Sequence, residues 1–256
     1  MLVIAFACVF LSDVTRVLFF AVTGILCAYE LSHNYEKLNV YCGAWVMYTY
    51  VAAQALLTLF HAGAIAYIAC MAGSIYLALL DGIIRHRVSG DGAVYTIMGL
   101  AYPSFLFGLL MMISVSPNWL DVLVLACFAT WVCDSFALIG GKRFGKHHVA
   151  PDVSPNKTVE GCVCGFISAL VTGVIIYLIP GLCEGIPLWL CVLTCAVAST
   201  MGQIGDLAES LIKRMIGVKD FSNLIPGHGG MFDRADSLLF SIPTAYICLF
   251  VFGYTL

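Results

Sequence analysis

The chain is built from apolar stretches about 20 residues long, separated by short gaps rich in glycine, proline and charged residues. A helix of that length spans the hydrocarbon core of a bilayer, and only helices and closed barrels satisfy their backbone groups there. Charged residues make up 11% of the chain, which leaves few side chains for a water-facing surface. The sequence therefore predicts an all-α, polytopic integral membrane protein.

A short apolar run at 2–11 precedes eight longer spans. It is either a half-helix or the start of a longer helix, so eight or nine transmembrane helices are expected. Because no basic residue precedes this run, a cleaved signal peptide is not expected. We predict a single membrane domain over 1–256, with N-terminal helices in 1–115 and the active site in 116–256. The eight predicted spans are 15–31, 40–59, 62–83, 92–114, 119–141, 159–180, 187–209 and 231–253.

The basic residues alternate between the gaps. Ten of the 12 Lys and Arg residues lie in the gaps 32–39, 84–91, 142–158 and 210–230, and the three intervening gaps hold none. Cytoplasmic loops carry such an excess of basic residues, so these four gaps are predicted to face the cytoplasm. For a compact chain without further domains, the bacterial inner membrane is the expected location.

Five carboxylates lie near the predicted cytoplasmic ends of the spans. Asp206 and Glu209 are three residues apart, as are Asp233 and Asp236, so each pair occupies one helix face. Asp134 lies near the end of an earlier span. Acidic residues are costly in a membrane and usually mark function, and oxygen-rich clusters suit Mg²⁺ bridged to a substrate phosphate. The alternative is that these acids form interfacial ion pairs with neighbouring basic residues.

Two polar loops, 140–161 and 210–236, flank these helices. Both contain lysines, hydroxyls and glycine amides, the groups that hold phosphate oxygens. In the first loop Thr158 has a second interpretation, as the N-cap of the following helix. The basic residues near 142–146 have a second interpretation as topology charges.

The segment from Ser210 to Asp236 resembles the signature of the CDP-diacylglycerol synthase (phosphatidate cytidylyltransferase) family. The resemblance extends over about 120–240, with further similar stretches at 134–145 and 154–161. Val159 and Ala235 depart from the pattern, in which an aromatic and a larger apolar residue are usual. The matching residues are Ser210, Lys213, Arg214, Lys219, Asp220, His228, Gly229, Gly230, Asp233, Arg234 and Asp236.

The resemblance implies transfer of CMP from CTP to phosphatidate, which gives CDP-diacylglycerol and pyrophosphate in phospholipid biosynthesis. The implied catalytic residues are Asp206, Asp233, Asp236, Lys213 and Arg214, and the implied metal ligands are Asp206, Asp233, Asp236 and Asp134. For His228, both a proton-carrying role and a structural or phosphate contact stay open. The implied substrate contacts are Ser154, Lys157, Thr158, Ser210, Lys219, Asp220, His228, Gly229, Gly230 and Arg234.

The expected cofactor is Mg²⁺, with a second, monovalent cation as a further expectation. The expected partners are CTP, phosphatidate, the lipid bilayer and a second copy of the chain in a homodimer, and no nucleic acid. One alternative is a CTP-dependent polyprenol or lipid kinase, which would release CDP. Another is an ion-coupled transporter, which predicts two similar halves with broken helices. The acids cluster near one end of the chain, which argues against the transporter.

The charge pattern makes a topology prediction. On a cysteine-depleted background, Gly145→Cys is expected to react with a membrane-impermeant thiol reagent only from the cytoplasmic side. Gly181→Cys, a matched glycine in a gap without basic residues, is expected to react only from the outside. Labelling of Gly145→Cys from the outer side alone would overturn the topology.

Overall fold

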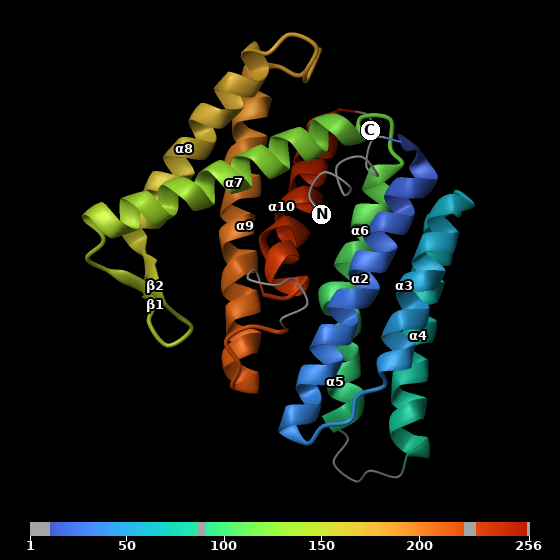
Figure 1. Cartoon of the computed structure of the whole chain (residues 1–256). Coiled ribbons are helices and arrows are strands. Elements are labelled where there is room, and N and C mark those ends of the chain that lie inside the picture. The colour runs from blue at the N-terminus through green and yellow to red at the C-terminus, as the bar shows by residue number, and fades with distance from the viewer. Residues whose placement is uncertain (1–10, 86–90, 223–228, 255–256) are drawn as a thin grey trace. The chain divides into compact units, whose positions relative to one another are not determined.

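The computed structural model describes residues 11–85, 91–222 and 229–254 (Figure 1). These ranges are largely helical, with one short two-stranded hairpin. Apart from Leu11, the apolar run at 2–11 lies outside the described residues. The helices are α2 (Asp13–Tyr35), α3 (Ala44–Leu59), α4 (Ala64–Ile84), α5 (Asp91–Gly99), α6 (Phe105–Ser114), α7 (Trp119–Phe144), α8 (Val159–Leu178), α9 (Leu188–Ile216) and α10 (Phe232–Val251), and the strands are β1 (His148–Ala150) and β2 (Ser154–Thr158).

Seven of the described helices are long and apolar enough to cross a membrane, with α5 and α6 counted as one continuous span. An eighth, α3, is apolar and 16 residues long. These eight segments coincide with the eight predicted spans. α4 buries only Ser74 and Ala78, and a helix that is apolar on its exposed faces is suited to lipid contact. The all-α, multi-pass membrane fold is therefore confirmed.

The chain divides into two compact units, each formed from two stretches of sequence. The first unit contains α2 to α6 and the segment 218–234, and the second contains α7 to α9, the hairpin and the part of α10 that begins at Ala235. The boundary therefore falls inside the first turns of α10. The single membrane domain expected from the sequence stays a prediction.

In the first unit, Glu30 of α2 holds the start of α10. Its side chain is buried, and its Oε1 accepts hydrogen bonds from the Ser222 hydroxyl at 2.5 Å and the Met231 amide at 2.9 Å. Its Oε2 accepts the Phe232 amide at 2.8 Å. The first amides of a helix lack partners within the helix and carry partial positive charge, so they suit a buried carboxylate. Glu30 thus fixes where α10 begins.

Asn34, one turn further along α2, extends this anchor. Its buried Nδ2 donates to the Glu30 carbonyl and the Phe221 carbonyl, both at 2.7 Å. The ring of Phe221 stacks on that of Phe232, with 4.8 Å between centroids. Hydrogen bonds therefore hold Phe221 and Ser222, and also Met231 and Phe232, against α2.

In the second unit, α7 and α8 approach each other through small residues. A Cβ at Gly161 would lie 2.6 Å from the Ala137 carbonyl, and a Cβ at Gly165 would lie 2.8 Å from the Cys133 carbonyl. This Gly-xxx-Gly spacing is a recurrent device for close helix packing in membranes. The crossing brings the β1–β2 hairpin, which joins the two helices, to one end of the pair (Figure 1).

The anchor at Glu30 makes a stability prediction. Glu30→Gln keeps the size of the side chain but turns one acceptor oxygen into an amino group that faces backbone donors. At least one buried amide then loses its partner, at a cost of about 1–3 kcal/mol. We expect a lower thermal unfolding midpoint for the purified protein in detergent.

Glu36→Gln is the matched control, because Glu36 lies at the end of the same helix with a side chain that is 55% exposed. Its unfolding midpoint is expected to stay at the wild-type value. Equal midpoints for Glu30→Gln and Glu36→Gln would contradict the anchoring role.

Candidate active site

Three carboxylates meet in the second unit. One oxygen each of Asp206, Glu209 and Asp236 lies within 4.8 Å of the other two. Asp206 and Glu209 come from one face of α9, and Asp236 comes from the second turn of α10. Of the two pairs expected to converge, both acids of α9 meet one acid of α10, Asp236, and Asp233 is not part of the cluster.

Gly205 explains how the two helices come close enough. A Cβ at this position would lie 2.7 Å from the Asp236 carbonyl oxygen and 2.8 Å from the ring of Phe240. Those distances are too short for any larger residue without a shift of α10. Glycine therefore permits the helix contact that brings Asp206 and Asp236 together.

Glu209 is the most enclosed of the three acids, with a side chain that has no exposed surface. Lys213, one turn along α9, places its Nζ 2.5 Å from Glu209 Oε2. Lys213 also interacts electrostatically with Asp236. A buried carboxylate is tolerated when a cation pairs with it, so Lys213 stabilises the cluster.

A second lysine reaches the cluster from the hairpin. The Nζ of Lys157, on β2, lies 2.7 Å from Asp206 Oδ2 and donates to the Gln203 carbonyl at 2.9 Å. Asp134 of α7 interacts electrostatically with both Asp206 and Lys157. The three carboxylates are thus flanked by two lysines from different elements, with a fourth acid nearby.

Local capping interactions hold the hairpin at the start of α8. The Thr158 hydroxyl accepts the Gly161 amide at 3.2 Å, so Thr158 is the N-cap of α8, which is one of its two interpretations from sequence. Glu160 accepts the amides of Lys146 and His147 at 3.0 and 3.2 Å. The Thr158 cap fixes the end of β2, and therefore Lys157, relative to α8, and the Glu160 bonds fix the residues just before β1.

The end of α9 is attached to the hairpin as well. The Arg214 Nε donates to the Val153 carbonyl at 3.2 Å, beside Ser154 at the start of β2. Ser210, one turn before Arg214 on α9, is buried. The predicted site residues Ser154, Ser210 and Arg214 thus all belong to the unit that carries the cluster.

The remaining residues of the signature belong to the first unit. Asp233 Oδ2 accepts the amides of Gly230 at 2.8 Å and Phe221 at 3.2 Å. Gly229 has φ of +81°, a left-handed conformation that favours glycine. Asp233 therefore orders the turn that leads into α10. Lys219, Asp220 and Arg234 are exposed, and His228 lies outside the described residues.

The observed cluster shares two acids with the predicted ligand set and does not include Asp134 or Asp233. It contains Asp206 and Asp236, and Glu209 completes it although the predicted set leaves Glu209 out. The sequence signal that could have included Glu209 is its position three residues after Asp206, on the same helix face. The sequence analysis assigned no role to Glu30. The signal that could have found it is that Glu30 is a lone acid in an apolar span. The roles of all these residues stay predictions.

The donor set suits a hard cation bound together with phosphate. Three carboxylate oxygens carry more negative charge than the two flanking lysines offset, and carboxylate oxygens are the ligands that Mg²⁺ prefers. Lysines beside such an ion attract phosphate oxygens. The cluster can therefore hold a divalent cation and a polyphosphate.

Comparison with known proteins agrees with this chemistry. Residues 1–252 match the model of the cytidylyltransferase family. A phosphatidate cytidylyltransferase of Staphylococcus saprophyticus is 37% identical over 165 residues, which are 64% of this chain and 62% of that protein. One of Bacillus subtilis is 45% identical over 128 residues, which are 50% of this chain and 47% of that protein.

A phosphatidate cytidylyltransferase of Staphylococcus aureus is 35% identical over 166 residues, which are 64% of this chain and 62% of that protein. The chain thus spans less than two thirds of the length of these relatives. The family model, in contrast, covers nearly all of the chain. The chain belongs to the cytidylyltransferase family.

Proposed function

We propose that the chain transfers CMP from CTP to phosphatidate and releases pyrophosphate, with CDP-diacylglycerol as the lipid product. The observation that carries the proposal is the group of three carboxylates flanked by Lys157 and Lys213 at the ends of membrane helices. The names of the relatives from Staphylococcus and Bacillus support the same reaction.

The reaction needs positioning and charge neutralisation more than covalent help from the protein. A phosphate monoester oxygen of phosphatidate attacks the α-phosphorus of CTP. The bond from that phosphorus to the oxygen that bridges it to the β-phosphorus breaks, and pyrophosphate leaves with the electron pair. Both reactants are anions, so the lysines at the cluster serve to bind and orient phosphate oxygens.

Asp206, Glu209 and Asp236 are the residues that would hold Mg²⁺ in this proposal, with Asp134 and Asp233 as the further predicted ligands. The bound ion supplies positive charge that offsets the triphosphate. Lys213 pairs with Glu209 inside the protein, and Lys157 orients Asp206. The second, monovalent cation stays a prediction without assigned residues.

We place the protein in a bacterial inner membrane, with the carboxylate cluster on the cytoplasmic side. The bacterial relatives support the first part, and the basic residues of the gaps 142–158 and 210–230 support the second. CTP is a cytosolic solute and phosphatidate a membrane lipid, so a site at this side gives both access. The homodimer stays a prediction.

The reaction class is tested directly. Purified protein in mixed micelles with phosphatidate and Mg²⁺ is expected to convert CTP labelled at the α-phosphorus into labelled CDP-diacylglycerol, with one pyrophosphate per turnover. Chromatography of lipid and aqueous products measures both. Release of CDP together with a newly phosphorylated lipid would instead establish the kinase.

The carboxylate cluster makes a second prediction. Asp206→Asn, Glu209→Gln and Asp236→Asn each keep the size of the side chain and remove one negative charge. Losing an anionic ligand beside a developing phosphate charge is expected to slow turnover roughly 10²–10³-fold or more. Steady-state rates at saturating CTP, measured across a range of Mg²⁺ concentrations, are the readout.

Glu184→Gln is the control, because Glu184 is an exposed acid in the loop between α8 and α9. It should leave turnover and the Mg²⁺ dependence unchanged. Near-normal turnover in two of the three cluster variants at saturating Mg²⁺ would rule out the metal-site proposal.

A further inference from the structure

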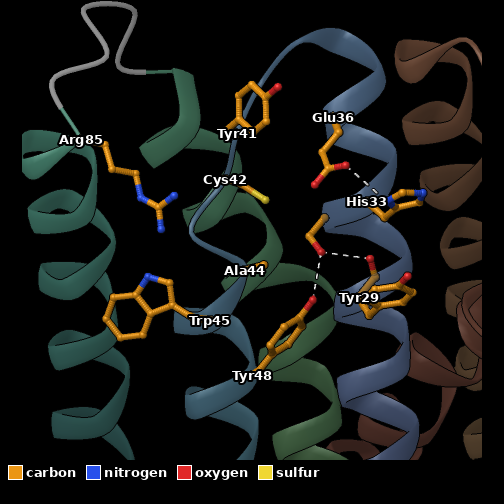
Figure 2. Close-up of a pocket in the computed structure, with 10 residues that line it drawn as sticks. Tyr29, His33, Glu36, Tyr41, Cys42, Ala44, Trp45, Tyr48 and Arg85 are labelled. Atoms are coloured by element: carbon orange, nitrogen blue, oxygen red, sulfur yellow. Dashed lines mark hydrogen bonds and ion pairs between the residues drawn. The ribbon is translucent and has the colours of Figure 1, made fainter.

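A cavity of about 270 Å³ lies in the first unit, between the ends of α2 and α4 and the start of α3 (Figure 2). Its lining comes from these helices and from the short connection between α2 and α3. The ends of membrane helices mark the depth of the lipid headgroups. A polar cavity at this depth is placed to receive a headgroup.

One side of the cavity carries a fixed cation. The Arg85 Nε lies 2.9 Å from Asp81 Oδ2, and Asp81 Oδ1 accepts the Trp45 indole N–H at 2.9 Å. Asp81 thus holds the guanidinium and the indole in place at once. The terminal amino groups of Arg85 have no hydrogen-bond partner among the residues that the structure describes. These groups are the ones that bind phosphate oxygens in pairs.

The opposite side carries an anion. Figure 2 shows Glu36 and His33 across the cavity from Arg85, with the Glu36 Oε2 3.3 Å from the His33 Nδ1. The Glu36 side chain is 55% exposed, so it is available to a ligand. The cavity therefore presents one positive and one negative group on facing sides.

Aromatic rings form much of the remaining lining. Tyr29, Tyr41, Trp45 and Tyr48 all line the cavity, and Tyr29 stacks on His33 with 5.9 Å between centroids. Aromatic faces attract ammonium groups, and tyrosine and tryptophan are common at the membrane–water interface. Burial raises the pKa of the Cys42 thiol to about 11, so this residue adds no negative charge near neutral pH.

We propose that this cavity binds the headgroup of a zwitterionic phospholipid. The phosphate contacts Arg85, and the ammonium group contacts Glu36 and the aromatic faces. An anionic headgroup without an ammonium group would contact Arg85 but leave Glu36 and the aromatic faces without a cation, and a simple cation would face Arg85. The proposal does not depend on the reaction proposed for the carboxylate cluster.

Trp45 provides the test, because it lines the cavity. In a variant that keeps only this tryptophan, with Trp119, Trp131 and Trp189 replaced by phenylalanine, short-chain phosphatidylethanolamine is titrated into detergent micelles. We expect a saturable change in fluorescence. Arg85→Gln and Glu36→Gln in this background should each weaken the apparent affinity about tenfold or more, since each removes one charged contact.

Glu184→Gln, from the loop between α8 and α9, is the matched control and should leave the titration unchanged. Native mass spectrometry of the same variants gives a readout independent of fluorescence. The zwitterionic assignment would be overturned by two results together. Phosphatidylglycerol would bind as tightly as phosphatidylethanolamine, and Glu36→Gln would leave the midpoint of the phosphatidylethanolamine titration unchanged. Equal binding of soluble phosphoethanolamine would overturn the lipid assignment, and no saturable response would overturn the site.

Discussion

Carboxylates enclosed in membrane helices must be given donors or cations, and this requirement organises each unit of the protein. Glu209 is fully enclosed and pairs with Lys213 one turn away. Glu30 is buried as well, yet it is satisfied by the first amides of α10 and the Ser222 hydroxyl. Each unit thus contains an acid that would be unfavourable alone and that the fold pairs, and Glu30 also fixes the start of α10 once paired.

Close helix packing makes the carboxylate cluster of the second unit possible. Helices in lipid gain little from burying apolar side chains, so they rely on small residues that allow backbones to approach. Gly205 lets α10 pass close to α9, and Gly161 and Gly165 let α7 pass close to α8. The first contact assembles the acids, and the second positions the hairpin that delivers Lys157. Geometry at the cluster therefore depends on positions that carry no functional group.

The sequence predicted the spans well because span length and hydropathy are local properties of the chain. It also predicted Asp206 and Asp236 as partners, since helix periodicity sets their faces. It did not predict that 148–158 forms a hairpin, or that Glu30 contacts Met231 and Phe232. Those features depend on contacts between distant residues, which no local pattern encodes. Thr158 illustrates the limit, because a cap and a phosphate contact need the same hydroxyl.

The two acids of the Asp-Arg-x-Asp stretch make different contacts, although both lie on one helix. Asp236 joins the carboxylate cluster, and Asp233 accepts amides from Phe221 and Gly230 in the turn before α10. A carboxylate just inside a helix N-terminus stabilises that end through the exposed amides and the helix dipole. The same short stretch therefore sets where α10 begins and supplies an acid one turn later. Spacing alone predicts the same role, metal binding, for Asp233 and Asp236. The hydrogen bonds of Asp233 show that it also orders the turn before α10.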